Sequence, residues 1–145
     1  MVLTRRRVGA DKASCLLLPL KADERTSLRG RRHTACGRSV LLQLPRQGPL
    51  QAGECLAPEQ GSMLVMVQAA DEAQLLVTAD SPLNLLKAAY HLGNRHVALE
   101  LHSDSLRLLD DSVLATMLSS RGLSVRKVVE PFEPELGAYS EIVHH

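Results

Sequence analysis

The chain has 145 residues, enough for one domain or two small ones, and its aromatic content of 2% requires a core of leucine, valine and alanine. It has no run of about 18 apolar residues that could cross a membrane, and its first residues lack the apolar segment of a signal peptide. The three cysteines (Cys15, Cys36 and Cys55) are far apart, which is typical of free thiols in a reducing compartment. We therefore expect a cytoplasmic protein.

The charge is distributed unevenly although the net charge is only +1. Residues 1–46 carry eleven Lys or Arg and three Asp or Glu, a net charge of +8, whereas residues 47–145 carry six and thirteen, a net charge of −7. Such polarity favours docking to charged partners, but two ordinary solvated surfaces explain it equally well.

Residues 1–70 predict a small all-β domain. Its expected strands are short apolar runs: 14–20, 39–44 and 63–67. The segments between them, 22–37 and 45–62, are rich in Gly, Pro and charged residues and are expected to be connections. Pro19 lies within the first run and indicates an edge strand, because proline has no N–H to donate to a neighbour. A domain boundary is expected within residues 68–73.

Residues 71–145 predict a ferredoxin-like domain with the order β-α-β-β-α-β, followed by a tail. The expected strands are 74–78, 96–101, 106–109 and 123–129. From about residue 131, two prolines and Gly137 predict an irregular, mobile tail. The whole chain is thus expected to be α+β, with a β-rich domain before the ferredoxin-like one.

Both helices expected in this second domain carry start and stop signals. Ser81 and Pro82 suit the N-cap and the first helical position, and Gly93 is expected to end the first helix. An aspartate at 110–111 caps the second helix, which Gly122 ends. The faces expected to be buried are Leu85, Leu86, Ala89 and Leu92 in the first helix and Val113, Leu114, Met117 and Leu118 in the second.

The histidines are the best candidates for chemistry. His96 stands where a helix gives way to a strand, so its imidazole can remain accessible to a Ni, Cu, Zn or Fe ion while its backbone is held; a helix-end histidine bonded to backbone fits the spacing as well. One imidazole does not hold a metal, but a two-fold axis would supply a second. The terminal pair His144 and His145 can reach a metal bound elsewhere, or is a solvated tail or the remnant of a purification tag. His91 and His102 are weaker candidates that also suit solvent-facing positions.

The sequence offers little support for catalysis or for RNA binding. We find no nucleophile elbow, phosphate-binding loop or zinc-protease motif, which argues against an enzyme. The basic runs at 5–7 and 29–32 raise the possibility of RNA binding, since RNA-recognition modules share the ferredoxin-like topology. Such modules stack bases on sheet aromatics, and the strands expected in the second domain have none. A general Zn or Cu buffer is a further alternative.

Two longer motifs resemble those of the UreE family of urease accessory metallochaperones. Residues 90–96, Tyr-His-Leu-Gly-Asn-Arg-His, resemble the family signature, and residues 131–139, Pro-Phe-Glu-Pro-Glu-Leu-Gly-Ala-Tyr, are similar to its Pro-Phe-x-Pro-Glu-x-Gly-Ala-Tyr stretch. Residues 1–6 and 41–48 resemble its opening strand and its Leu-Pro-Arg-Gly turn. The resemblance therefore extends over nearly the whole chain.

The resemblance implies an N-terminal domain that engages partner proteins and a ferredoxin-like domain that forms a homodimer. His96 from both subunits would hold one Ni(II) at the interface, assisted by His144 and His145, and the ion would pass through the GTPase UreG to the urease active site. Zn(II) or Cu(II) could bind in vitro. The resemblance implies neither an enzyme nor a partner among nucleic acids or membranes.

The chain departs from the family pattern at three places. Many relatives have a His-x-His pair just before the second helix, where this chain has Asp110 and Ser112, so only Asp110 remains as a weak oxygen ligand for an auxiliary site. The tail holds two histidines rather than many, which predicts a small capacity for storing ions. Ala98 stands where many relatives have proline, a change expected to matter little.

Overall fold

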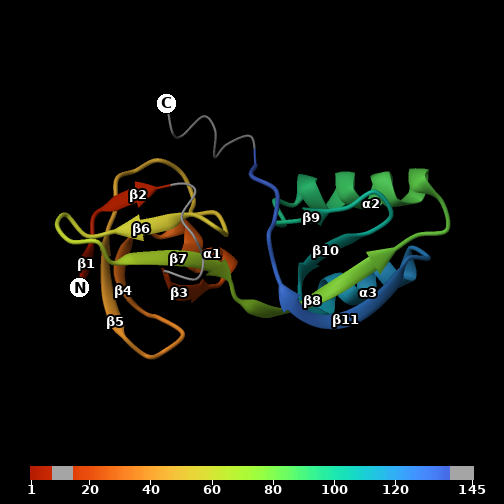
Figure 1. Ribbon diagram of the computed structural model, residues 1–145. Helices are drawn as coiled ribbons and strands as arrows, with labels where there is room; N and C mark the ends of the chain where they lie inside the picture. The colour runs from red at the N-terminus through yellow and green to blue at the C-terminus, as the bar shows by residue number, and fades with distance from the viewer. Residues whose placement is uncertain (8–14, 138–145) are drawn as a thin grey trace. The chain divides into compact units, whose positions relative to one another are not determined.

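The computed structural model describes residues 1–7 and 15–137 (Figure 1). The described chain forms two compact units, Met1–Ala70 and Asp71–Gly137. The first is mostly β-structure and the second has a four-stranded sheet with two helices, which confirms the α+β class expected from the sequence. No helix within the described residues has the length and apolarity required to cross a membrane.

The described residues of the first unit form two sheets and one short helix. Its elements are β1 (Val2–Leu3), β2 (Arg5–Arg7), β3 (Cys15–Leu20), α1 (Ala22–Thr26), β4 (Arg29–His33), β5 (Ser39–Gln43), β6 (Cys55–Ala57) and β7 (Leu64–Ala69). The strands form sheets of order β1-β5-β4 and β2-β6-β7-β3. Leucines and valines of both sheets share one apolar core, as the shortage of aromatic residues requires.

Strand β3 lies at an edge of its sheet, as Pro19 predicts. It pairs in parallel with β7, and the Pro19 side chain is exposed. The expected connections 22–37 and 45–62, however, contain α1, β4 and β6. Strand β4 reads Arg-Gly-Arg-Arg-His and has no apolar alternation. Backbone pairing with β5 alone holds it at a sheet edge, so its sequence does not reveal a strand. Strand β6 has only three residues, all buried, and is too short to show a period.

The second unit has the order expected for a ferredoxin-like fold. Its elements are β8 (Asp71–Thr78), α2 (Pro82–Asn94), β9 (Glu100–Leu101), β10 (Leu106–Leu109), α3 (Ser112–Ser120) and β11 (Ser124–Pro131). The strands pair antiparallel in the order β11-β8-β10-β9, so β9 and β11 are the two edges. Leucines of β8 and β10 share a core with Ala88 and Leu92 of α2 and Leu118 of α3, so both helices pack on the same core as these strands.

The buried faces of the helices were only partly predicted. Leu92 and Leu118 are buried, but Leu86 and Val113 expose 66% and 71% of their surfaces. Helix α2 is apolar on two sides, and the sheet covers only the side that carries Leu85, Ala88 and Leu92. A stripe read from the sequence merges those two sides, which explains the error at Leu86.

The end of α2 also differs from the prediction. Gly93 lies within the helix, which continues to Asn94, and the strand expected over 96–101 is reduced to Glu100–Leu101. At α3 the prediction was right: Asp111 is the N-cap, accepting the backbone N–H of Val113 at 2.9 Å. The helix ends before Gly122, which has a φ of 84°.

Candidate metal centre at the end of helix α2

His96 occupies a backbone position that normally belongs to glycine. The N–H of His96 donates to Gly93 O at 3.0 Å and that of Val97 donates to Leu92 O at 3.1 Å. These two bonds form a Schellman motif, in which the residue after the helix adopts the left-handed conformation. His96 has a φ of 60°, and no other non-glycine residue of the described chain has a positive φ.

Helix α3 ends in the same motif, which provides an internal comparison. There Gly122 N–H donates to Ser119 O at 3.0 Å and Leu123 N–H donates to Leu118 O at 3.2 Å. The position of His96 in this second motif is held by Gly122. Because the left-handed conformation costs an L-residue about 1–2 kcal/mol, the chain keeps at His96 a strain that it avoids at Gly122.

The turn therefore fixes the backbone of His96 and leaves its side chain exposed. Two backbone hydrogen bonds fix the turn, and Val97, the next residue, packs against the apolar core of the unit. The His96 side chain itself is exposed. Strain at an exposed residue that can bind metals is a common mark of a functional position.

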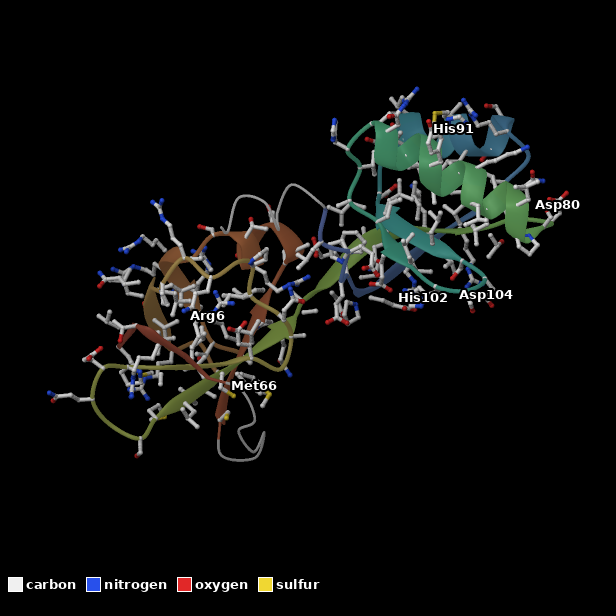
Figure 2. All side chains as sticks on the ribbon, turned by 90° about the horizontal axis from the view of Figure 1, so that it is seen from above. Arg6, Met66, Asp80, His91, His102 and Asp104 are labelled. Atoms are coloured by element: carbon white, nitrogen blue, oxygen red, sulfur yellow. The ribbon has the colours of Figure 1, made fainter. Side chains whose placement is uncertain are left out.

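The weaker candidate ligands lie on separate elements. His91 is half-buried on α2, and its ring meets Tyr90 edge-on with centroids 5.5 Å apart. His102, in the β9–β10 turn, has Nε2 at 2.6 Å from Glu100 Oε2. Asp110 precedes α3 and its Oδ2 lies 3.7 Å from Lys127 Nζ. Figure 2 shows His91 and His102 on opposite sides of the unit, one on the helical layer and the other at the turn.

No three metal-binding side chains gather within residues 1–7 and 15–137 of one chain. His144 and His145 lie outside the described residues, but the segment that leads to them is anchored. Phe132 is fully buried, Glu133 N–H donates to Glu100 Oε1 at 2.8 Å, and Glu135 N–H donates to Leu99 O at 2.7 Å. The segment expected to be a mobile tail from 131 is therefore irregular but attached as far as Glu135, beside the chain that follows His96.

A row of exposed apolar side chains follows α2 on the side away from the core. Leu83, Leu86 and Tyr90 are spaced by about one helical turn and expose 59%, 66% and 70% of their surfaces. We call these three residues the α2 stripe. It runs along the helix that precedes His96, and large apolar side chains grouped in this way mark contact surfaces.

Several basic residues of the first unit are used inside it. The Arg6 guanidinium pairs with the Glu54 carboxylate and donates to Gly48 O at 2.9 Å. Arg5 donates to Pro58 O at 2.7 Å. Figure 2 labels Arg6, which lies among the first unit's strands. The Arg5 and Arg6 side chains thus fix the β2 strand to neighbouring loops, and the basic run at 5–7 does not present them as an open nucleic-acid surface.

Cys36 has an altered acidity. It is exposed in the β4–β5 turn, 3.2 Å from the Thr34 hydroxyl oxygen. That hydrogen bond, the backbone of Arg38 and the positive charge of Arg38 stabilise the thiolate and hold the pKa of Cys36 below its usual value. A thiolate within a basic hairpin is more reactive than the buried thiol of Cys55.

Comparison with known proteins identifies the family. Residues 4–70 match the family model of the UreE urease accessory protein N-terminal domain, and residues 72–145 match that of its C-terminal domain. The chain is 57% identical to a urease accessory protein UreE of Parasynechococcus marenigrum over 99% of its own length and 96% of the relative's. It is 51% identical to that of Thermosynechococcus vestitus over 89% and 90% of the two lengths. The chain belongs to the UreE family of urease accessory proteins.

Proposed function

We propose that this chain is a nickel metallochaperone that works as a symmetric homodimer. One Ni(II) ion binds between the two His96 side chains, and the dimer delivers the ion through the GTPase UreG to the urease active site. The observation that carries the proposal is His96 itself, an exposed imidazole kept at a strained position where the neighbouring helix uses glycine. Membership of the UreE family supports the same assignment.

The α2 stripe supports the dimer. Burial of a leucine side chain contributes about 1.5–3 kcal/mol, and Leu83, Leu86 and Tyr90 now expose more than half of their surfaces. A second copy presents an identical stripe, so the contact is self-complementary under a two-fold axis. His96 follows the same helix, and pairing of the stripes near their C-terminal ends would draw the two imidazoles toward one ion.

The tail supplies further ligands in this proposal. Glu135 is attached to Leu99, which is three residues beyond His96. The nine residues from 136 to 144 can span at most about 30 Å, so His144 and His145 can reach an ion at His96. Asp110, His91 and His102 are secondary ligands at most, because Asp110 and His102 would first have to leave Lys127 and Glu100.

Transfer would occur by ligand exchange. Two imidazoles and the tail donors would leave coordination positions for water, and such a site releases its ion when a partner with better-matched ligands docks. We assign no step that makes or breaks a bond in an organic substrate. The free thiols Cys36 and Cys55 suit a reducing compartment, and we place this function in the cytoplasm.

Two alternatives make different predictions. A general Zn or Cu buffer would bind those ions without a role in urease maturation; tighter Cu(II) than Ni(II) binding in vitro would not support it, since Cu(II) outbinds Ni(II) at most nitrogen sites. An RNA-binding protein would be retained on RNA in a salt-dependent, metal-independent manner. The strands of the second unit carry no aromatic side chain for base stacking, and we therefore favour the metal assignment.

The central test is a nickel titration of the wild-type protein beside His96→Ala. We expect one tight Ni(II) per dimer in the wild type and none in the variant, with circular dichroism unchanged. His33→Ala is the matched control, because His33 is an exposed histidine of the first unit and should leave the affinity unaltered. Unchanged nickel affinity in His96→Ala would reject the assignment.

A further inference from the structure

Strand β4 leaves one edge of its sheet open in the first unit. The sheet has the order β1-β5-β4, so only one side of β4 pairs with a neighbouring strand. An open edge presents the backbone groups of every second residue, and an extended segment of another chain can add to it as a new strand. Which residues of β4 point outward therefore decides what the edge offers to a partner.

Hydrogen bonds at the two ends of β4 show which of its residues bond to β5. Just before the strand, Leu28 O accepts the N–H of Leu44 at 3.1 Å. Just after it, Thr34 N–H donates to Arg38 O at 2.9 Å. Bonded and non-bonded positions alternate along an antiparallel pair, so every second residue between these two, the even-numbered ones, bonds to β5.

The odd-numbered residues of β4 consequently point their backbone groups out of the sheet. The register places Arg31 opposite Leu41, whose N–H donates to Met1 O at 2.9 Å on the other side of β5. Because the Leu41 backbone faces β1, that of Arg31 faces away from β5. The three outward residues are Arg29, Arg31 and His33, and all three are exposed.

The open edge offers hydrogen-bond donors more than acceptors. Within residues 1–7 and 15–137, the outward N–H groups of Arg29, Arg31 and His33 have no hydrogen-bond partner. Two of the outward carbonyls are already engaged: Ser27 Oγ donates to Arg29 O at 3.2 Å, and Arg32 Nη1 donates to Arg31 O at 2.8 Å. A ligand rich in acceptor oxygens therefore fits this edge.

The side chains at this edge are basic and lack acidic partners. Arg29 and Arg31 are exposed in the strand, and Arg38 is exposed just beyond the turn. None of these three forms an ion pair with a carboxylate of the described residues, whereas Arg6 of the same unit is paired with Glu54. Unpaired positive charges on one hairpin attract a segment that carries negative charge.

The same features argue against two other occupants. A second copy of this chain that added its own β4 would place arginine beside arginine, and like charges on neighbouring strands destabilise the pair. RNA would be attracted by the charge, but it has no peptide backbone to pair with the edge. Neither β4 nor β5 carries a Phe, Tyr or Trp on which a base could stack.

We propose that the β4 edge binds an acidic, extended segment of a partner protein, which adds to the sheet as a further strand. The segment's backbone carbonyls accept the outward N–H groups, and its carboxylates lie beside Arg29 and Arg31. Both the acceptors of an extended chain and the outward N–H groups repeat about every 7 Å. The engaged carbonyls of β4 each have a second lone pair for the segment's own N–H groups. This inference goes beyond metal binding and does not involve His96.

The test is the binding of a labelled peptide to the metal-free full chain, measured by fluorescence anisotropy at low salt. The probe alternates Glu and Thr over about eight residues, so its carboxylates lie on one face of the added strand. We expect saturable binding that weakens about tenfold when Arg29→Glu and Arg31→Glu are combined. The matched control combines Arg121→Glu and Arg126→Glu, which changes the net charge equally at exposed arginines of the second unit and should leave the affinity unchanged.

A second pair of variants tests the backbone bonds and leaves every arginine in place. His33→Pro removes one outward N–H, which β5 does not use. It should bind the peptide about three- to tenfold more weakly than His33→Ala, which keeps that N–H. A Glu-Thr peptide with N-methylated alternate residues keeps the charges but cannot pair as a strand. It should bind wild type more weakly to a similar extent, and it carries this test if His33→Pro does not fold.

Amide hydrogen exchange locates the added strand. In the free protein, the N–H groups of Arg29, Arg31 and His33 should exchange quickly, whereas β5 protects those of the even-numbered residues. The peptide should slow the exchange of the three outward groups. Protection elsewhere, without any change at these three, would overturn the proposal.

The remaining outcomes decide between this proposal and its alternatives. Absence of saturable binding, or equal binding of a Lys-Thr peptide, would mean that the arginines only protect the edge from aggregation. Equal affinity for N-methylated and unmodified peptides would mean charge attraction without strand addition. Tighter binding of single-stranded RNA at the same arginines would assign the edge to nucleic acid. His96→Ala should bind the peptide as wild type does, so failure of the metal assignment and failure of this inference are distinguishable.

Discussion

Replacing His96 by glycine should make the protein more stable while it removes the ligand that we propose for the metal. His96 adopts a φ of 60°, which costs an L-residue about 1–2 kcal/mol. Glycine avoids that cost, but its unfolded chain has more freedom, which returns about 0.4–1 kcal/mol. The expected gain in the free energy of unfolding is therefore about 0.5–1 kcal/mol, or about 2–8 °C in Tm for a domain of this size.

The assay is urea unfolding of metal-free wild type, His96→Gly and His96→Ala at one protein concentration, because dimerisation would make stability depend on concentration. Alanine keeps the strained φ but lacks the imidazole, so His96→Gly compared with His96→Ala isolates the effect of the backbone conformation. Gly122→Ala is the mirror control: a Cβ at Gly122 meets nothing within 4 Å, so any loss comes from its φ of 84°. The Gly122→Ala variant should lose about 1 kcal/mol of its free energy of unfolding. Equal stability of His96→Gly and His96→Ala would refute the claim that this position is strained.

Three other perturbations follow from the structure. Leu86→Glu should leave the unit folded but convert dimers to monomers in sedimentation experiments, whereas the same change at the equally exposed Val113 of α3 should not; a dimeric Leu86→Glu protein would exclude the α2 stripe as the contact. Deleting residues 144–145 should weaken nickel binding or lower its stoichiometry without preventing dimerisation, and monomers after this deletion would show that the tail has another role. Since the pKa of Cys36 is lowered, its alkylation rate should reach a plateau at a lower pH than that of an ordinary thiol. Under native conditions Cys36 should also be alkylated faster than the buried Cys55, which mass spectrometry after brief labelling measures.

The second unit could be predicted from sequence because its signals are local. Ser81 accepts the Asn84 N–H, Asp111 caps α3, and Gly122 ends it, each as its residue type suggests. The strands of this unit alternate around a helix-covered core, so their pattern carries information. Gly93 misled the prediction, because a glycine near a helix end looks like a stop, whereas the stop is formed three residues later by a histidine.

The first unit was harder to predict because some of its strands are held by backbone pairing with a neighbouring strand and show no alternation of apolar residues in the sequence. Strand β4 has charged side chains and depends on β5 for its hydrogen bonds, and no sequence window reveals such a partner. The same limit applies to Glu100, whose binding of the Glu133 backbone joins residues far apart in sequence. His96 was identified as a candidate from its place after a helix, but its left-handed backbone conformation was not, since histidine rarely adopts it.

Helix α2 carries two apolar sides, and the sheet covers one. A lone copy must therefore keep Leu83, Leu86 and Tyr90 in water, where they are as available to a wrong neighbour as to the right one. The solubility of the single chain and the dimerisation that we propose thus involve the same three side chains. Polar replacements at these positions, introduced to reduce nonspecific association, would also remove the surface that we assign to the dimer contact.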